Sequence, residues 1–259
     1  MSAPAPRLDV RDLSRSFGGI AAVRNVSFTI PRGQLVGLVG PNGAGKTTLF
    51  NLLAGTLAPD RGTVLFDGET LTGKGVGAIA RGGLGRCFQA ATVFPGVSVR
   101  EQLTRAAYLR HVGRPRDLFG RGRLAEAWRA AEARTEDLLS FLDLGALAER
   151  AADTLAYGQQ KILGLGMALA TDPRMVLADE PAAGLNPVET RGMEELLRRV
   201  RAERGVDILL VEHDLRMVMA LCDRLIVLNA GEVIADDVPS VVRHDPAFVA
   251  AYLGEVDAA

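Results

Sequence analysis

Hydrophobic and polar residues alternate in the first quarter of the chain, as they do along half-buried β-strands. The alternation is clearest in Val26–Ile30, and it returns around Val64 and Phe66. Turn-forming glycine, proline and aspartate residues stand between these segments. The pattern therefore predicts short strands joined by turns.

The pattern changes at Gln34. Gln34–Val39 is a mostly apolar run, which favours a buried strand, and Lys46–Gly55 follows as a short helix. A glycine-rich turn separates the two segments. Strand, glycine-rich turn and helix together form the beginning of a parallel α/β unit.

The middle of the chain has helical spacing of its apolar residues, from about Val99 to Ala152. Within it, Arg105–Arg134 contains eight arginines and three acidic residues, a difference of five positive charges. Pro115 and several glycines predict a helix–loop–helix arrangement there. Two interpretations stay open for this segment: a solvated insertion, or a docking surface for a partner or for lipid headgroups.

The second half of the chain returns to alternating strands and helices. A helical face is predicted over Pro187–Val200, and a small helical tail over Ser240–Leu253. The predicted strands are Arg174–Ala178, Ile208–Val211 and Leu225–Leu228. The sequence thus predicts an α/β core that is interrupted by a helical insertion.

Composition excludes several classes of protein. The chain has 259 residues and a formal net charge of −1, and 48% of its residues are hydrophobic. These values predict one or two globular domains and argue against nucleic-acid binding driven by overall basicity. Cys87 and Cys222 cannot form a disulfide framework and are expected to be small buried residues in a reducing cytosol. No apolar run approaches the length of a membrane span, and Met1–Asp9 lacks the apolar region of a secretory signal.

The strongest motif is Gly40–Thr47, which matches the phosphate-binding pattern G-x-x-x-x-G-K-[ST] after a strand and before a helix. Small residues allow backbone N–H groups to surround phosphate oxygens. The Lys46 amine can reach the β- and γ-phosphates, and the Thr47 hydroxyl can ligate Mg²⁺. An ordinary glycine turn is the alternative. The predicted nucleotide-binding residues here are Gly40, Pro41, Asn42, Gly43, Ala44, Gly45, Lys46, Thr47 and Thr48.

A second motif is the carboxylate pair Asp179 and Glu180, which follows the apolar strand Arg174–Ala178. Asp179 is a candidate metal ligand, and Glu180 can polarise a water molecule for attack on a γ-phosphate. Carboxylates often follow strands by chance, so this motif gains its meaning from the phosphate-binding loop upstream.

At this point the chain resembles a family, the ATP-binding cassette (ABC) ATPases, over essentially residues 8–235. Leu155–Gln160 resembles the ABC signature, which implies that Ala156, Tyr157, Gly158 and Gln159 bind a second face of the nucleotide. Ala183–Asn186 stands where the family has a dimer-contacting loop.

The resemblance also assigns roles to three separate residues. Gln89 fits the glutamine that links the core to the helical subdomain and contacts metal and water. His213 fits the switch histidine that contacts the γ-phosphate, and Phe17 fits the aromatic residue that stacks on adenine. Their ordinary alternatives are a polar loop residue for Gln89, a surface or core histidine for His213 and a core side chain for Phe17.

The implied fold is α/β: a P-loop NTPase (RecA-like) core with an N-terminal antiparallel β subdomain and an inserted α-helical signature subdomain. The expected boundaries are about 1–88 and 166–236 for the core and 89–165 for the helical subdomain, with a tail at 237–259. The implied cofactors are ATP and Mg²⁺, and the implied activity is ATP hydrolysis coupled to transport.

Four short sequence segments resemble one branch of the family in particular, the ATPase subunits of importers for branched-chain and other hydrophobic amino acids. These segments are Phe94–Glu101, Tyr157–Gln160, Asp179–Pro187 and Val211–Leu215. A urea or amide importer, an efflux system and a soluble non-transport ABC ATPase are the alternatives within the family. A non-hydrolysing subunit and a kinase or GTPase are further alternatives.

The implied partners are a second ATPase subunit (a copy or a paralogue), separate transmembrane permease subunits and, indirectly, a solute-binding protein, but no nucleic acid. The implied location is cytoplasmic, on the inner face of the cell membrane. The resemblance implies that the permease and the solute-binding protein, rather than this chain, determine which solute is transported.

Four residues depart from the family pattern. Ala156 replaces a serine, Tyr157 a glycine and Asn186 an aspartate, and Ala178 is small for its position before the metal carboxylate. We expect the loss of the Ser hydroxyl at Ala156 to weaken phosphate coordination without abolishing function.

Overall fold

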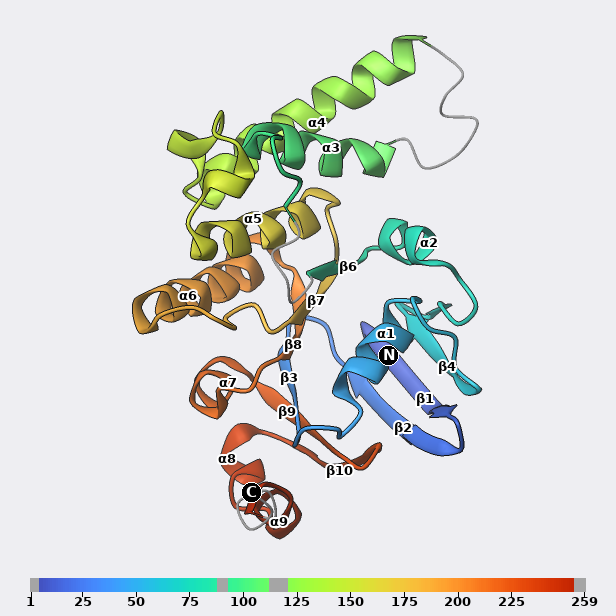
Figure 1. Ribbon diagram of the computed structural model, residues 1–259. Coiled ribbons are helices and arrows are strands. Elements are labelled where there is room, and N and C mark those ends of the chain that lie inside the picture. The colour runs from blue at the N-terminus through green and yellow to red at the C-terminus, as the bar shows by residue number, and fades with distance from the viewer. Residues whose placement is uncertain (1–4, 88–92, 112–120, 254–259) are drawn as a thin grey trace. The chain divides into compact units, whose positions relative to one another are not determined.

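The computed structural model describes residues 5–87, 93–111 and 121–253 (Figure 1). The chain forms two compact units: residues 1–79 with 201–259, and residues 80–200. The subdomain boundaries expected from the sequence stay predictions.

The first unit contains a four-stranded antiparallel sheet with strand order β2-β1-β4-β5. Val10 on β1 pairs with Phe28 on β2 and with Val64 on β4, so buried side chains meet across three strands. The alternation in the sequence places Val26, Phe28 and Ile30 in the core, as predicted. The strands are β1 (Leu8–Phe17), β2 (Ile20–Ile30), β4 (Arg61–Phe66) and β5 (Glu69–Thr70).

The same unit holds four strands of a second sheet, in the order β10-β9-β3-β8: β3 (Leu35–Val39), β8 (Asp207–Val211), β9 (Arg224–Asn229) and β10 (Glu232–Asp237). Strand β3 is parallel to β8 and β9, and β10 is antiparallel to β9. All residues of β3 and β8 are buried, which explains their continuous apolar sequences. Gly37 is required at the centre of β3, because a Cβ there would lie 2.7 Å from Leu225 Cδ2.

Among the residues that the structure describes, four helices lie entirely within the first unit. Helix α7 begins after Asp214, whose carboxylate accepts hydrogen bonds from the backbone N–H groups of Arg216 and Met217. The predicted helical tail consists of two helices, α8 and α9. The helices are α1 (Lys46–Leu53), α7 (Leu215–Leu221), α8 (Pro239–Val242) and α9 (Pro246–Leu253); α2 (Val76–Arg81) spans the boundary between the units.

The second unit combines two parallel strands, β6 (Leu84–Cys87) and β7 (Met175–Asp179), with helices. Its helices are α3 (Val99–His111), α4 (Arg121–Phe141), α5 (Tyr157–Ala170) and most of α6 (Pro187–Arg204), with 3-10 turns at Gly145–Leu147 and Ala152–Thr154. Helices α3 and α4 pack together through the buried hydroxyls of Thr104 and Thr135, which are 3.0 Å apart. They are the two helices predicted on either side of the loop, and residues 112–120 between them lie outside the described residues.

Part of the positive charge of Arg105–Arg134 is balanced by this unit's own acids. Arg105 pairs with Glu101, and both Arg110 and Arg134 pair with Asp172. These ion pairs favour the solvated insertion over a purely cationic docking surface. Over the part of the chain that the structure describes, no helix is both long and apolar enough to cross a bilayer.

Candidate nucleotide-binding and hydrolysis site

The phosphate-binding loop joins the end of β3 to the start of α1, as the sequence predicts. Its glycines have left-handed backbone conformations, with φ values of 153° at Gly40 and 101° at Gly45. A Cβ on Gly40 would lie 2.0 Å from the carbonyl oxygen of Leu228, and one on Gly45 would lie 2.2 Å from that of Ala22. Any other residue at these two positions would push the loop away from the strands beneath it.

Lys46 is folded back into the concavity of this loop. Its ammonium donates hydrogen bonds to the carbonyl oxygens of Gly40, at 2.6 Å, and Pro41, at 2.9 Å. The side chain is only 7% exposed, whereas Asn42 and Thr47 are exposed. Gly45 supplies no side-chain cap to α1, so the first N–H groups of that helix face a site that suits an anion. The loop therefore fits a polyphosphate group.

Asp179 and Glu180 lie at the end of β7, in the second unit. The Asp179 side chain is buried, and its Oδ2 accepts a hydrogen bond of 3.0 Å from Arg86 Nη2 on β6. Glu180 has a left-handed backbone, with φ at 49°, which is strained for a residue with a side chain. Its carbonyl oxygen accepts a 3.0 Å hydrogen bond from the Lys161 ammonium. Neither Arg86 nor Lys161 was identified as a site residue from the sequence.

The signature segment opens α5, also as predicted. The Ala156 N–H donates to Gln159 Oε1 at 3.2 Å, which is one half of a capping box. The other half needs a side-chain acceptor that alanine lacks. Gly158 is buried, and a Cβ on it would lie 2.8 Å from Glu189 Oε1. The ring of Tyr157 covers Gly184 in the same way, with Cε1 3.0 Å from the position of a Cβ.

The segment expected to contact a second subunit leads into α6 through a complete capping box. Asn186 Oδ1 accepts from the N–H groups of Val188, at 2.9 Å, and Glu189, at 3.1 Å, while Glu189 Oε2 accepts from the Asn186 N–H at 3.1 Å. Asparagine caps a helix as well as aspartate does. The replacement of aspartate by Asn186 is therefore compatible with the local structure.

The three residues assigned singly from the resemblance lie in different places. His213 is exposed just after β8, and its backbone N–H donates to Glu212 Oε2 at 3.3 Å. Phe17, at the end of β1, is 46% exposed with the Arg15 guanidinium 5.1 Å from its ring centre, so it does not fill the core. Gln89 lies outside the described residues.

The two cysteines are buried, as expected. Burial raises the pKa of the Cys87 thiol to about 11; the Asp179 carboxylate adds to this effect and Lys161 opposes it. Burial also raises the pKa of Cys222, and the neighbouring Asp223 contributes. Both thiols are therefore protonated at neutral pH.

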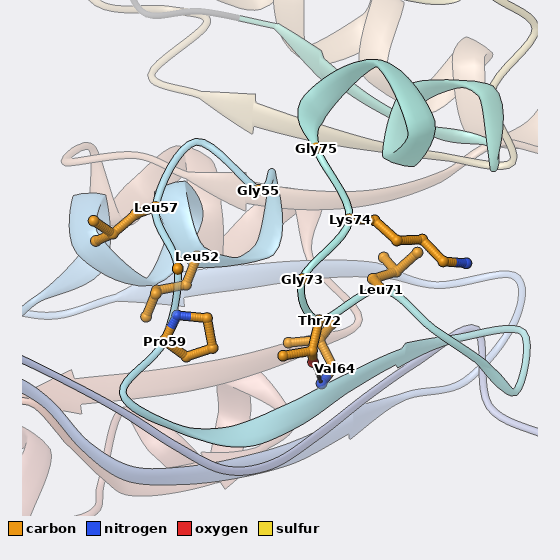
Figure 2. A pocket seen from close by; sticks show the side chains of 11 residues that line it. Leu52, Gly55, Leu57, Pro59, Val64, Leu71, Thr72, Gly73, Lys74 and Gly75 are labelled. Carbon is orange, nitrogen blue, oxygen red and sulfur yellow. Dashed lines mark hydrogen bonds between the residues drawn. The ribbon is translucent and has the colours of Figure 1, made fainter.

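A pocket of about 200 Å³ in the first unit is separate from these motifs (Figure 2). It lies between the end of α1 and the segment after β5, and Leu52, Leu57 and Pro59 line one side of it. The Lys74 side chain points away from these residues. None of the site residues predicted from the sequence lines the pocket.

The fold and the motifs together define an ATP-binding cassette. The ABC transporter family profile matches residues 23–183, and the chain belongs to this family. It is therefore an ATPase, and its domain binds ATP. The predicted α/β P-loop fold is confirmed by solved structures. A nucleotide-free ATP-binding cassette from an ABC transporter has a TM-score of 0.83 at 29% identity, and covers 96% of this chain and 99% of that chain. The ADP conformation of the cassette MJ1267 has a TM-score of 0.80, with the same identity and coverage.

Curated relatives match over nearly the full length of the chain. BraF of Pseudomonas aeruginosa, a high-affinity branched-chain amino acid transport ATP-binding protein, is 40% identical over 252 residues, which are 96% of this chain and 98% of BraF. LivG of Escherichia coli K12, which has the same description, is 39% identical over 254 residues with the same coverage. LptB of Escherichia coli K12, a lipopolysaccharide export system ATP-binding protein, is 30% identical over 248 residues, covering 96% of this chain and 97% of LptB.

Proposed function

We propose that this chain is the ATPase subunit of an importer for branched-chain amino acids. The higher identity to BraF and LivG than to LptB favours uptake of amino acids over export of lipopolysaccharide. The observation that carries the ATPase activity is the loop around Lys46, in which Gly40 and Gly45 have no room for a side chain and the lysine is held inside the loop.

In this proposal the first step is binding of ATP. The N–H groups of Gly43–Thr48 and the Lys46 ammonium bind the phosphates, and Phe17 stacks on the adenine. Magnesium prefers oxygen ligands and few of them from protein, and the family resemblance implies that the Thr47 hydroxyl and the Asp179 carboxylate would supply them. When bound, Mg²⁺ would neutralise the negative charge that develops on the phosphates during transfer.

Hydrolysis then requires activation of a water molecule. The Glu180 carboxylate accepts a proton from water as the water oxygen bonds to the γ-phosphorus and the bond to the leaving β-phosphate oxygen breaks, giving ADP and phosphate. The family resemblance assigns contact with the γ-phosphate to His213, and contact with the metal and the water to Gln89. The strained backbone of Glu180 supports a functional role for this residue.

The proposal requires two ATPase subunits. The sequence contains one phosphate-binding loop and one signature, and in the family arrangement the signature of one subunit binds the nucleotide held by the other. Ala156–Gln159 would supply the N-terminus of α5 to the partner's γ-phosphate. Separate permease subunits would span the membrane, with this chain at its cytoplasmic face and a solute-binding protein delivering the amino acid.

Uptake in the source organism tests this function. A strain lacking the gene is expected to lose uptake of radiolabelled leucine, isoleucine and valine, and the wild-type gene is expected to restore it. A Lys46→Ala gene should not restore uptake, because its product lacks the phosphate-binding ammonium. Loss of urea uptake alone, or retention of all three amino-acid uptakes, would overturn the assignment of the solute.

A further inference from the structure

Arg86 forms an ion pair with the residue that is assigned to the metal. The two side chains come from neighbouring parallel strands, β6 and β7, on which Arg86 pairs in register with Leu177. The distance from Arg86 Nη2 to Asp179 Oδ2 is 3.0 Å, and the side chains are 12% and 9% exposed. This contact lies wholly within the second unit, and it is not explained by the chemistry of ATP hydrolysis described above.

Because this ion pair is buried, its two opposite charges attract each other strongly. An interaction between opposite charges strengthens as water is removed from around them, so the guanidinium largely cancels the charge that Asp179 presents to a cation. A divalent cation that approaches Asp179 therefore meets a neutral pair instead of an isolated carboxylate.

We propose that Arg86 is the built-in counter-ion of Asp179, which holds the metal-binding carboxylate in place before the cation arrives and lowers the affinity for that cation. The inference rests on the proposed role of Asp179 as a metal ligand. A bound cation either stays near the guanidinium, and is repelled by it, or displaces the guanidinium from its buried partner. Both routes weaken cation binding, so removal of the Arg86 charge should strengthen it. Arg86 is in this sense a positioning residue and not a catalytic one.

The test uses Mn²⁺ as the probe and the full chain in complex with a non-hydrolysable ATP analogue. Electron paramagnetic resonance gives the dissociation constant of Mn²⁺ for wild type, Arg86→Gln, Arg86→Lys and Asp179→Asn. Arg86→Gln is expected to bind Mn²⁺ roughly tenfold more tightly than wild type, because one buried positive charge is gone. Arg86→Lys keeps the charge and is expected to stay within about twofold of wild type.

A second measurement follows the protein without metal. In EDTA and without nucleotide, Arg86→Gln is expected to lower Tm by on the order of 5–10 °C, since it leaves a buried carboxylate without its partner. Arg105→Gln is the matched control, because the exposed Arg105 pairs with the exposed Glu101 at 2.6 Å, within the same unit. This variant should leave the Mn²⁺ affinity unchanged. It should change the Tm by no more than about 2 °C.

The outcomes distinguish the role of Asp179 as a metal ligand from the role of Arg86 as its counter-ion. If Asp179→Asn leaves Mn²⁺ affinity unchanged, Asp179 is not a metal ligand and that part of the proposed function fails. If Asp179→Asn weakens Mn²⁺ binding but Arg86→Gln binds Mn²⁺ as wild type does, or more weakly, the counter-ion role of Arg86 is wrong. Arg86→Met keeps the apolar stem of the side chain and carries the same expectation if Arg86→Gln does not fold.

Discussion

The buried ammonium of Lys161, on α5, donates a hydrogen bond to the backbone carbonyl of Glu180, 3.0 Å away at the end of β7. The same residue lies 5.6 Å from the ring centre of Tyr157. One lysine thus connects the helix that carries the signature to the backbone of the carboxylate proposed as the general base. Both ends of this link belong to one protomer and to one unit of its fold.

Replacement of this lysine should slow hydrolysis without weakening nucleotide binding. In Lys161→Met, the left-handed backbone of Glu180 loses a charged hydrogen-bond donor that contributes about 1.5–3 kcal/mol. We expect kcat to fall about tenfold while the Kd for ATP stays within about twofold of wild type. Steady-state ATPase assays and equilibrium binding measure the two quantities.

The control for this variant is Lys74→Met. The Lys74 ammonium is exposed and 3.9 Å from Glu69, and its loss should leave kcat unchanged. A Lys161→Met protein with the wild-type kcat would show that this hydrogen bond does not position Glu180.

Gly158 and Gly164 lie on the same helix, α5. Substitution of each by alanine should change the free energy of unfolding in opposite directions. A Cβ on Gly158 meets Glu189, which then has to leave its bond to the Asn186 N–H, whereas a Cβ on Gly164 meets nothing within 4 Å. Gly158→Ala should cost about 1 kcal/mol through the lost capping box and lower ATPase activity more than tenfold. Gly164→Ala should raise the free energy of unfolding by up to about 1 kcal/mol with normal activity.

Urea denaturation and an ATPase assay of both variants check this pair. Equal ATPase activity in the two variants would contradict the proposal that the backbone at Gly158 binds the second face of the nucleotide.

The strands and the phosphate-binding loop could be predicted because their signals are local. Alternation in Val26–Ile30 reports one buried face, and a continuous apolar run such as Leu35–Val39 reports two. The glycines of Gly40–Gly45 were predicted to let backbone N–H groups surround phosphate oxygens. The structure shows what they approach, the carbonyl oxygens of Leu228 and Ala22, which no local pattern could reveal.

The residues that support the carboxylates could not be predicted, because their roles depend on pairing between distant segments. Arg86 and Asp179 are separated by 93 positions and meet only through the register of β6 with β7. Lys161 did carry a signal, since it is one of three lysines among 30 basic residues. That rarity marked the position without identifying its partner.

Loss of the Lys46 ammonium should abolish ATP binding. In Lys46→Ala, the loop keeps its glycines but loses the charge that the proposal places against the phosphates. We expect at least a hundredfold weaker binding of a fluorescent ATP analogue, measured by equilibrium titration, because a charged contact of at least about 2.7 kcal/mol is removed. An affinity for the analogue within threefold of wild type would contradict the proposal that Lys46 binds the phosphates of ATP.

Stability should fall in alkaline solution because of Cys87. Its pKa is raised by burial to about 11 from 9.0 in the unfolded chain, so the unfolded state loses its proton first as pH rises through this range. Stability from the protonated thiol is thus complete below pH 9 and is lost progressively towards pH 11, by on the order of 2 kcal/mol. Urea denaturation at pH 8.5 and 10.5 should show a smaller loss for Cys87→Ala. An identical pH dependence in the two proteins would contradict this, since Cys222 is present in both.

The most direct test of the account is sedimentation of the Glu180→Gln variant with ATP and Mg²⁺, combined with an assay of phosphate release. The variant keeps Lys46 and the signature but lacks the carboxylate that accepts the proton of water. The account predicts an ATP-dependent dimer of this chain, which wild type forms only transiently, and at least a hundredfold slower release of phosphate. A monomer at saturating ATP, or phosphate release at the wild-type rate, would contradict it.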